Sequence, residues 1–239
     1  MTVVPWLLHW NYERLDDELR KSFEVALHAG TAAALLITLR AEVADTMRGM
    51  DIERLGLIAL SSAPAALAGY GLERPIERLG TPSTVAAGLI AGAVGMALAD
   101  RRPQSRDRED VNWRDALVLG VAQACALVPG VSRNGATLAA ARARRFTRQD
   151  ANRLSRHMAL PVIAGASLLT GLRLRKRGLA PGAAVPFASG AAAAFASTLG
   201  STWLIGQVER DRSLLPYAAY RIVLGSLVME RVRHGRGPG

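Results

Sequence analysis

The feature that most constrains the fold of this 239-residue chain is a series of long segments with almost no charged residues. The four strongest segments lie at residues 23–39, 55–72, 83–99 and 179–207, and three weaker ones lie at 116–128, 158–172 and 213–229. A helix that crosses a bilayer needs about 17–25 mostly apolar residues. The sequence therefore predicts an all-α, polytopic integral membrane protein whose helices are joined by short charged connectors.

A soluble, alanine-rich helical protein is the main alternative, because the mean hydropathy is only +0.15. Helices on the surface of a soluble protein need a polar face, and residues 183–205 offer only Ser and Thr for one. Small residues such as Gly88 and Gly92, four positions apart, suit close packing of helices in lipid. We therefore favour the membrane interpretation.

The net charge of +10 could indicate a nucleic-acid partner. The basic residues, however, lie in the connectors and do not follow one helix face, so we interpret them as membrane-flanking charges and expect no nucleic acid. The single cysteine, Cys125, excludes an intramolecular disulfide and a cysteine-based zinc site. The charge counts on the connectors do not assign an orientation in the membrane.

An irregular motif interrupts the apolar run at residues 116–141. It reads Leu-Val-Pro-Gly-Val-Ser-Arg-Asn-Gly-Ala-Thr and ends at Thr137. A straight helix through Pro129 and Gly130 would cost roughly 3 kcal/mol or more, so two short helices meeting at a broken middle are expected. Broken backbone at membrane depth is tolerated where protein buries it or where it lines a wet cavity. Backbone N–H groups at a helix start, beside Arg133 and without a neighbouring acid, predict an anion site that suits phosphate.

The connectors and one helix carry further charges. Residues 40–54 are expected to form a mixed-charge loop, 73–82 a short turn and 100–115 a solvated loop. In the apolar segment 23–39, Glu24 and His28 lie one turn apart on one face. An ionisable pair inside an apolar helix is a functional candidate; the alternative places Glu24 at the membrane interface and His28 against a neighbouring helix.

In each half of the chain, a helix rich in Ala, Ser and Gly is followed by a short turn with Glu-Arg pairs and then by another helix. This similarity predicts an internal repeat within a single membrane domain spanning residues 1–239. Repeat 1 covers about 1–99, the loop covers 100–115, and repeat 2 covers about 116–229. Repeat 2 starts with the broken element, and repeat 1 has no counterpart to it. Inverted repeats in membrane proteins commonly place the substrate site at broken helices.

The motif at residues 129–137 resembles the signature Pro-Gly-x-Ser-Arg-Ser-Gly-x-Thr of the undecaprenyl-diphosphatase family, also known as bacitracin-resistance proteins. Residues 158–165 and 220–225 are similar to further blocks of that family. The resemblance covers essentially the whole chain, with one departure in the motif, where Asn134 stands in place of a serine. It implies an inverted repeat with re-entrant helix pairs, and a multi-pass enzyme of the bacterial inner membrane. Such an enzyme hydrolyses undecaprenyl diphosphate to the monophosphate carrier of peptidoglycan synthesis, which links it to cell-wall biogenesis, cell shape and resistance to bacitracin.

The family's first signature, Glu-x-x-Thr-Glu-Phe-Leu-Pro-x-Ser-Ser-x-x-His, matches no residue of this sequence. We expect it to lie upstream of Met1, lost through a misassigned start codon or a genuine truncation. In the family its glutamates are thought to supply the acid/base or metal-binding part of the site. A divalent cation, Mg²⁺ or Ca²⁺, would suit such a site, but the sequence predicts no metal-binding residue of its own.

The resemblance and the chemistry of diphosphate cleavage assign roles within the motif. The predicted catalytic residues are Ser132 as nucleophile or hydroxyl ligand, Arg133 as a bidentate phosphate clamp, and Thr137 as a second hydroxyl ligand. The predicted substrate-binding residues are Gly130, Asn134, Gly135, Glu24 and His28. The alternative for Arg133 is an interfacial arginine that reaches for lipid headgroups.

The expected partners are a polyprenyl diphosphate and the membrane lipids. The sequence is compatible with a homodimer, and it does not determine the chain length of the substrate lipid. The alternative function is a non-catalytic lipid-phosphate binder or transporter, because broken-helix repeats also serve transport.

Overall fold

The computed structural model describes residues 17–158, 184–208 and 213–234, together with Pro161, Gly165 and Leu172. In these ranges the regular structure is helical, and the only β-type pairing is an isolated bridge between Arg106 and Phe146. The helices are α2 (Asp17–Thr38), α3 (Arg40–Arg48), α4 (Ile52–Gly71), α5 (Glu73–Arg78), α6 (Pro82–Asp100), η2 (Arg108–Asp110), α7 (Trp113–Cys125), α8 (Arg133–Ala143), α10 (Ala184–Val208) and α11 (Leu215–Arg233). Residues 148–158 are also helical. The prediction of an all-α fold is confirmed.

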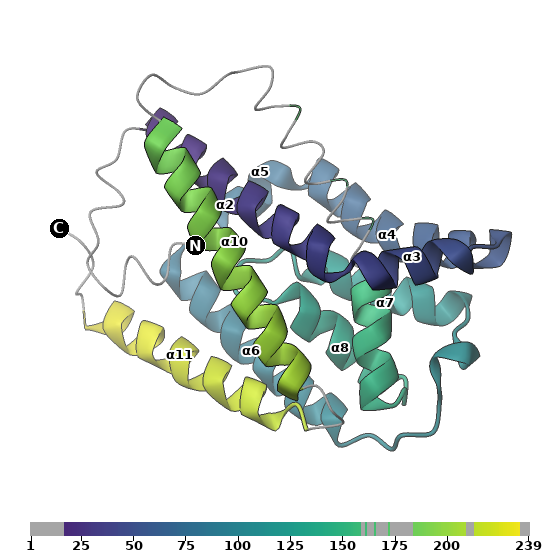
Figure 1. Cartoon of the computed structure of the whole chain (residues 1–239). Helices are drawn as coiled ribbons and strands as arrows, with labels where there is room; N and C mark the ends of the chain where they lie inside the picture. The colour runs from purple at the N-terminus through teal and green to yellow at the C-terminus, as the bar shows by residue number, and fades with distance from the viewer. Residues whose placement is uncertain are drawn as a thin grey trace. The chain divides into compact units, whose positions relative to one another are not determined.

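The chain forms two compact units. The described part of the first unit holds α4 to α8, the helical residues 148–158, and α11; that of the second holds α2, α3 and α10. Figure 1 shows α6 and α11 side by side in the first unit, where they are in contact.

In the first unit, α4 packs against α7 at a position set by a proline and a glycine. Pro64 lies inside the continuous helix α4 and has no N–H to donate to the carbonyl of Leu60. A Cβ at Gly120 of α7 would lie 2.8 Å from the carbonyl oxygen of Ser61, so the glycine allows the two backbones to approach. Gln123, one turn further along α7, donates a 2.9 Å hydrogen bond from Nε2 to the same Ser61 carbonyl. The sequence predicted a kink at Pro64; the structure shows that this part of α4 is the contact surface for α7.

In the second unit, α2 packs against α10 through small residues. A Cβ at Gly30 would lie 2.0 Å from the carbonyl oxygen of Ala191, which requires glycine at that position. Gly190 leaves room for the ring of Phe23. The contact between these two apolar helices is therefore one of close backbone approach, the kind of packing that small residues permit.

The predicted membrane segments agree with α2, α4, α6, α7, α10 and α11 to within a few residues at most ends. Two connectors were predicted wrongly, since the expected loop at 40–54 contains α3 and the expected turn at 73–82 contains α5. Most of the predicted helix at 158–172 lies outside the described residues.

Within the described residues, α6 is the one helix that is long and apolar enough to cross a membrane, judged by length and composition alone. Only 28% of its apolar window is buried, whereas a core helix of a soluble protein would be mostly buried. A shorter apolar stretch lies at Val25–Thr38.

Candidate active site

The motif forms a turn between two short helices, as its sequence predicts. Helix α7 ends at Cys125, and α8 begins at Arg133. Between them, Val128 and Val131 close tight turns by donating their N–H groups to carbonyls three residues back. Gly130 has φ +91°, a backbone conformation that L-residues with a side chain rarely adopt. The predicted break at the centre of the apolar run is confirmed.

The motif turn packs directly on α6. A Cβ at Gly130 would lie 2.1 Å from the carbonyl oxygen of Val85. A Cβ at Gly88 would lie 2.5 Å from the carbonyl oxygen of Pro129. Both glycines are therefore needed for the backbone of the turn to rest on the helix. The sequence predicted that Gly88 mediates close helix packing, and the structure places the motif turn against it.

Arg221 of α11 holds the same turn from the other side. Its NH2 group donates a 2.7 Å hydrogen bond to the carbonyl oxygen of Gly130. Gly92 of α6 leaves room for this guanidinium, because a Cβ there would lie 3.0 Å from NH2. The sequence alone assigned no role to Arg221. The signal that could have found it is a single arginine in the middle of an otherwise apolar stretch of α11.

Ser132 caps the start of α8. Its Oγ accepts a 3.2 Å hydrogen bond from the backbone N–H of Gly135, which leaves the hydroxyl hydrogen free to donate. The N–H groups of a helix's first turn have no partner within the helix, and the helix dipole adds a partial positive charge there. Arg133 and Asn134 occupy the first two positions of this turn. The predicted helix start beside the arginine is thus present, and it offers donors to an anion.

Two arginines of α8 have different surroundings. Arg142 is 1% exposed, and its guanidinium donates to the carbonyl oxygens of Phe146 and Arg102. Arg133 is half-buried, and no described residue accepts a hydrogen bond or forms an ion pair with its guanidinium. Arg142 therefore has a structural role at the end of the helix, whereas the charge of Arg133 is available to a ligand at the beginning.

The side chain of Thr137 is buried and lies in a network that the sequence did not predict. Its hydroxyl is 2.5 Å from Oγ of Ser155, which belongs to the helical residues 148–158. Thr137 also lies within hydrogen-bonding distance of the carbonyls of Arg133 and Asn134. Ser155 in turn donates a 2.8 Å hydrogen bond to Oδ1 of Asn134. The structure therefore brings together Asn134 and Thr137 through Ser155.

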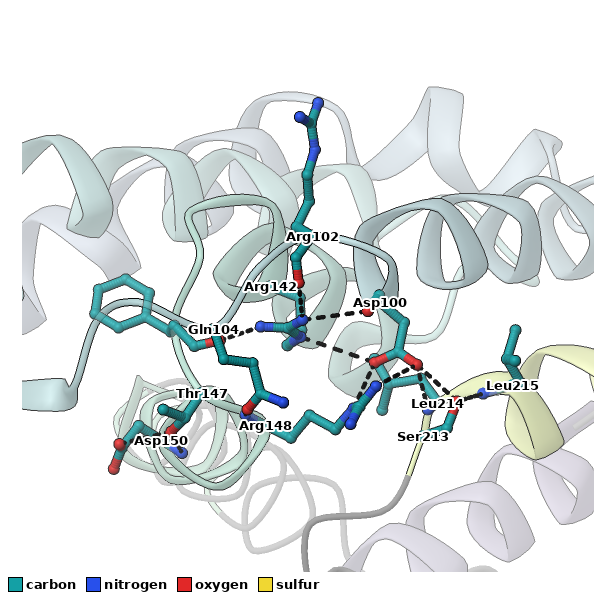
Figure 2. A network of polar contacts seen from close by, with 11 residues as sticks. Asp100, Arg102, Gln104, Arg142, Thr147, Arg148, Asp150, Ser213, Leu214 and Leu215 are labelled. Atoms are coloured by element: carbon teal, nitrogen blue, oxygen red, sulfur yellow. Dashed lines mark hydrogen bonds and ion pairs between the residues drawn. The ribbon is translucent and has the colours of Figure 1, made fainter.

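A polar network fixes the other end of α8 (Figure 2). Asp100, the last residue of α6, accepts hydrogen bonds from the guanidinium of Arg148, the hydroxyl of Ser213 and the N–H of Leu214. Arg142 donates to the carbonyl of the same aspartate. Because Ser213 and Leu214 directly precede α11, this carboxylate ties the ends of α6 and α8 to the start of the helix that carries Arg221.

Asp115 is the centre of a second ion-pair network and has a fully buried side chain. Arg106 donates two hydrogen bonds to its carboxylate, at 3.0 and 2.6 Å, and Arg144 donates one at 2.6 Å. Burial alone would raise the pKa of Asp115, but these bonds and one from the N–H of Asn112 outweigh it and hold the pKa below its usual value. The connector at 100–115, expected to be a solvated loop, is therefore anchored at Arg106 and Asp115.

Glu24 and His28 belong to the second unit. His28 lies on an exposed part of α2, and the side chain of Glu24 lies outside the described residues. Their predicted part in substrate binding stays a prediction. Across the described residues, no three His, Cys, Asp or Glu side chains are grouped so that they could hold a metal ion. The described part of the chain therefore offers no such group of side chains to the divalent cation that the family resemblance suggests.

Comparisons with known proteins agree on one family. The sequence profile described as "Bacitracin resistance protein BacA" matches residues 1–227. A protein of Geobacter sulfurreducens named "Undecaprenyl-diphosphatase" is 38% identical over 96% of this chain and 88% of its own length. Proteins of the same name from Trichlorobacter lovleyi and Thermomicrobium roseum are 36% and 34% identical, over 96% and 99% of this chain and 87% and 91% of their own lengths.

Proposed function

The chain belongs to the BacA family of bacitracin-resistance proteins, and we propose that it is an undecaprenyl-diphosphate phosphatase. The reaction adds water across the phosphoanhydride bond, so that the bridging oxygen stays with the lipid and the terminal phosphate leaves. The products are undecaprenyl phosphate and inorganic phosphate. The lipid product is the carrier used in peptidoglycan synthesis, and its supply would support resistance to bacitracin.

The main support for this proposal is an arginine at the start of a helix that has no partner among the residues described by the structure. Arg133 has no hydrogen-bonding or ion-pairing partner among the described residues, although a half-buried guanidinium is costly to leave unpaired. The fork of a guanidinium matches two oxygens of a phosphate. The N-terminal N–H groups of α8 and the free hydroxyl hydrogen of Ser132 supply further donors to the same anion.

In this mechanism the motif stabilises charge. As the bond to the bridging oxygen breaks, negative charge develops on the terminal phosphoryl group and on the leaving oxygen. Fixed hydrogen-bond donors stabilise this charge, and such stabilisation is the largest contribution to catalysis of phosphoryl transfer. Ser132 is assigned as a phosphate ligand, because a serine nucleophile needs an adjacent base. Across the described residues, no His, Asp or Glu side chain is hydrogen-bonded to it.

We place the enzyme in the bacterial inner membrane as a multi-pass protein with an inverted repeat and a re-entrant helix pair. Helices α7 and α8, with 13 and 11 residues, extend only about 20 Å and about 17 Å. Neither reaches the roughly 30 Å of a bilayer core, which supports a pair that enters and returns. The apolar helix α6, on which the motif turn rests, supports a location at membrane depth.

The test is phosphate release by the purified full chain in phospholipid nanodiscs supplied with undecaprenyl diphosphate. The proposal predicts stoichiometric formation of undecaprenyl phosphate and inorganic phosphate. A non-catalytic lipid-phosphate binder or transporter would leave the diphosphate intact. That result would contradict the enzyme proposal and favour the alternative function.

A further inference from the structure

We propose that Ser155 is a positioning residue of the phosphate-binding turn, acting through Asn134. This inference rests on the proposed function. It adds a residue outside the motif that positions a phosphate-binding side chain within it. Ser155 is 3% exposed, so it is not placed to touch a substrate. It lies 18 residues beyond Thr137 and 21 beyond Asn134 in the sequence, yet its hydroxyl contacts both side chains.

The geometry places Ser155 against one face of the start of α8. Asn134 and Thr137 are three residues apart, so their side chains share a face of the helix. On another side of the same turn, Gly135 packs against α6, since a Cβ there would lie 2.9 Å from Sδ of Met96. The first turn of α8 therefore contacts two elements, α6 through Gly135 and the helical residues 148–158 through Ser155. The contact with Ser155 is the polar one.

The hydrogen atoms determine how the Asn134 amide is presented. A serine hydroxyl has one hydrogen, and Ser155 donates it to Oδ1 of Asn134. The hydrogen in the 2.5 Å contact with Thr137 then comes from Thr137. Because a threonine hydroxyl has only one hydrogen, this arrangement directs it to Ser155 and not to the carbonyls of Arg133 and Asn134, which lie 2.9 and 3.1 Å from the same oxygen. Oδ1 of Asn134 accepts the hydrogen bond from Ser155, and no described residue accepts a hydrogen bond from Nδ2 of the same amide. Asn134 is exposed, so this N–H₂ group is available to an incoming phosphate.

This arrangement gives a chemical role to Asn134, the one position at which the motif departs from the family signature. Asn134 stands where the family signature has a serine, and it offers two N–H donors in place of one hydroxyl hydrogen. An amide is useful to an anion only when its nitrogen faces it, since its oxygen would repel the phosphate. Ser155 supplies the donor that fixes this orientation.

The test is a double-mutant cycle between Ser155→Ala and Asn134→Ala, measured on the purified full chain. Two quantities are followed: kcat/KM for undecaprenyl diphosphate, and the affinity for inorganic phosphate by titration calorimetry. Each single variant is expected to lower both by about tenfold, the size of one lost hydrogen bond to a charged group. The double variant is expected to be no worse than Asn134→Ala alone, because Ser155 acts through that side chain.

The matched control is Ser61→Ala, which removes another fully buried serine hydroxyl of the same unit, one that donates only within α4. It should leave both quantities at wild-type values. If Ser155→Ala does not accumulate in the membrane, the cycle is run with Ser155→Cys, which keeps the volume with a weaker donor and should lose several-fold.

Wild-type values for Ser155→Ala, or losses that multiply in the double variant, would overturn the proposal. So would a wild-type chain that binds no phosphate. A wild-type chain that binds phosphate without releasing it from the lipid would refute the proposed function alone, and the cycle would then be read from phosphate affinity.

Discussion

The guanidinium of Arg221 donates a 2.7 Å hydrogen bond to the carbonyl oxygen of Gly130, which lies 91 residues earlier in the chain. This bond joins α11 to the centre of the motif turn. Gly92 of α6 makes the space in which the guanidinium lies. A residue that contacts only a backbone carbonyl of the motif can thereby set the position of the turn that precedes Arg133.

Replacing Arg221 by alanine should impair turnover through the shape of the turn. Loss of a charge-assisted hydrogen bond corresponds to about a 10- to 100-fold decrease in kcat/KM. Arg221→Lys keeps the charge but lacks the fork, and it should recover only part of the loss. Steady-state phosphate release measures both variants. Equal activity of Arg221→Ala and wild type would show that the turn keeps its position without this bond.

Gly130→Ala should destabilise the protein and abolish activity. A side chain at φ +91° costs about 1–2 kcal/mol, and the added Cβ would overlap the carbonyl of Val85 on α6. The control is Gly95→Ala, which lies in α6 with nothing within 4 Å of the added carbon. That change should be neutral, or stabilise the helix by roughly 0.5–1 kcal/mol. Thermal unfolding in detergent compares the two, and a wild-type midpoint for Gly130→Ala would contradict the packing described.

The Asp115 network predicts a dependence of stability on acidic pH. The folded pKa of Asp115 lies below its usual value, so its ion pairs contribute fully above about pH 3.9, the ordinary value of an aspartate. The contribution is lost as the pH falls through the lower, folded pKa. Asp115→Asn should remove this part of the acid dependence and lower stability by about 2 kcal/mol. That figure is below the roughly 3–5 kcal/mol of a fully buried pair, because Arg106 and Arg144 are partly exposed.

Unfolding midpoints between pH 2.5 and pH 6 test this prediction. The expected result is a steeper fall with decreasing pH for the wild type than for Asp115→Asn. Parallel curves for the two proteins would show that the carboxylate is not stabilised by its arginines.

The parts of the fold that were predictable are those set by local sequence. Apolar runs placed α4, α6 and the end of α2 closely, although α2 begins six residues before the predicted segment. The Pro129–Gly130 pair placed the break before α8, because proline and glycine act on the backbone where they stand. Helix α3 was missed because it has only nine residues and four of them are charged, so Val43 and Met47 give it only a short apolar stripe.

The candidate site was predictable only in the motif itself. Ser132 and Arg133 could be named from the residue types around a helix start. Ser155 and Arg221 act on the motif from segments 21 and 91 residues away, and a single sequence contains no record of which distant side chain meets which turn. The same holds for Asp100, whose partner Arg148 lies 48 residues further along the chain.

We propose that Arg133, which has no partner among the described residues, holds the phosphate of the substrate. The most direct test is the turnover of Arg133→Ala on undecaprenyl diphosphate, with Arg101→Ala as an exposed control on the same unit. We predict a loss of about a thousandfold or more in kcat/KM, with normal membrane insertion and an unchanged unfolding midpoint, and wild-type turnover for the control. Full activity of Arg133→Ala would show that the motif is not the active site.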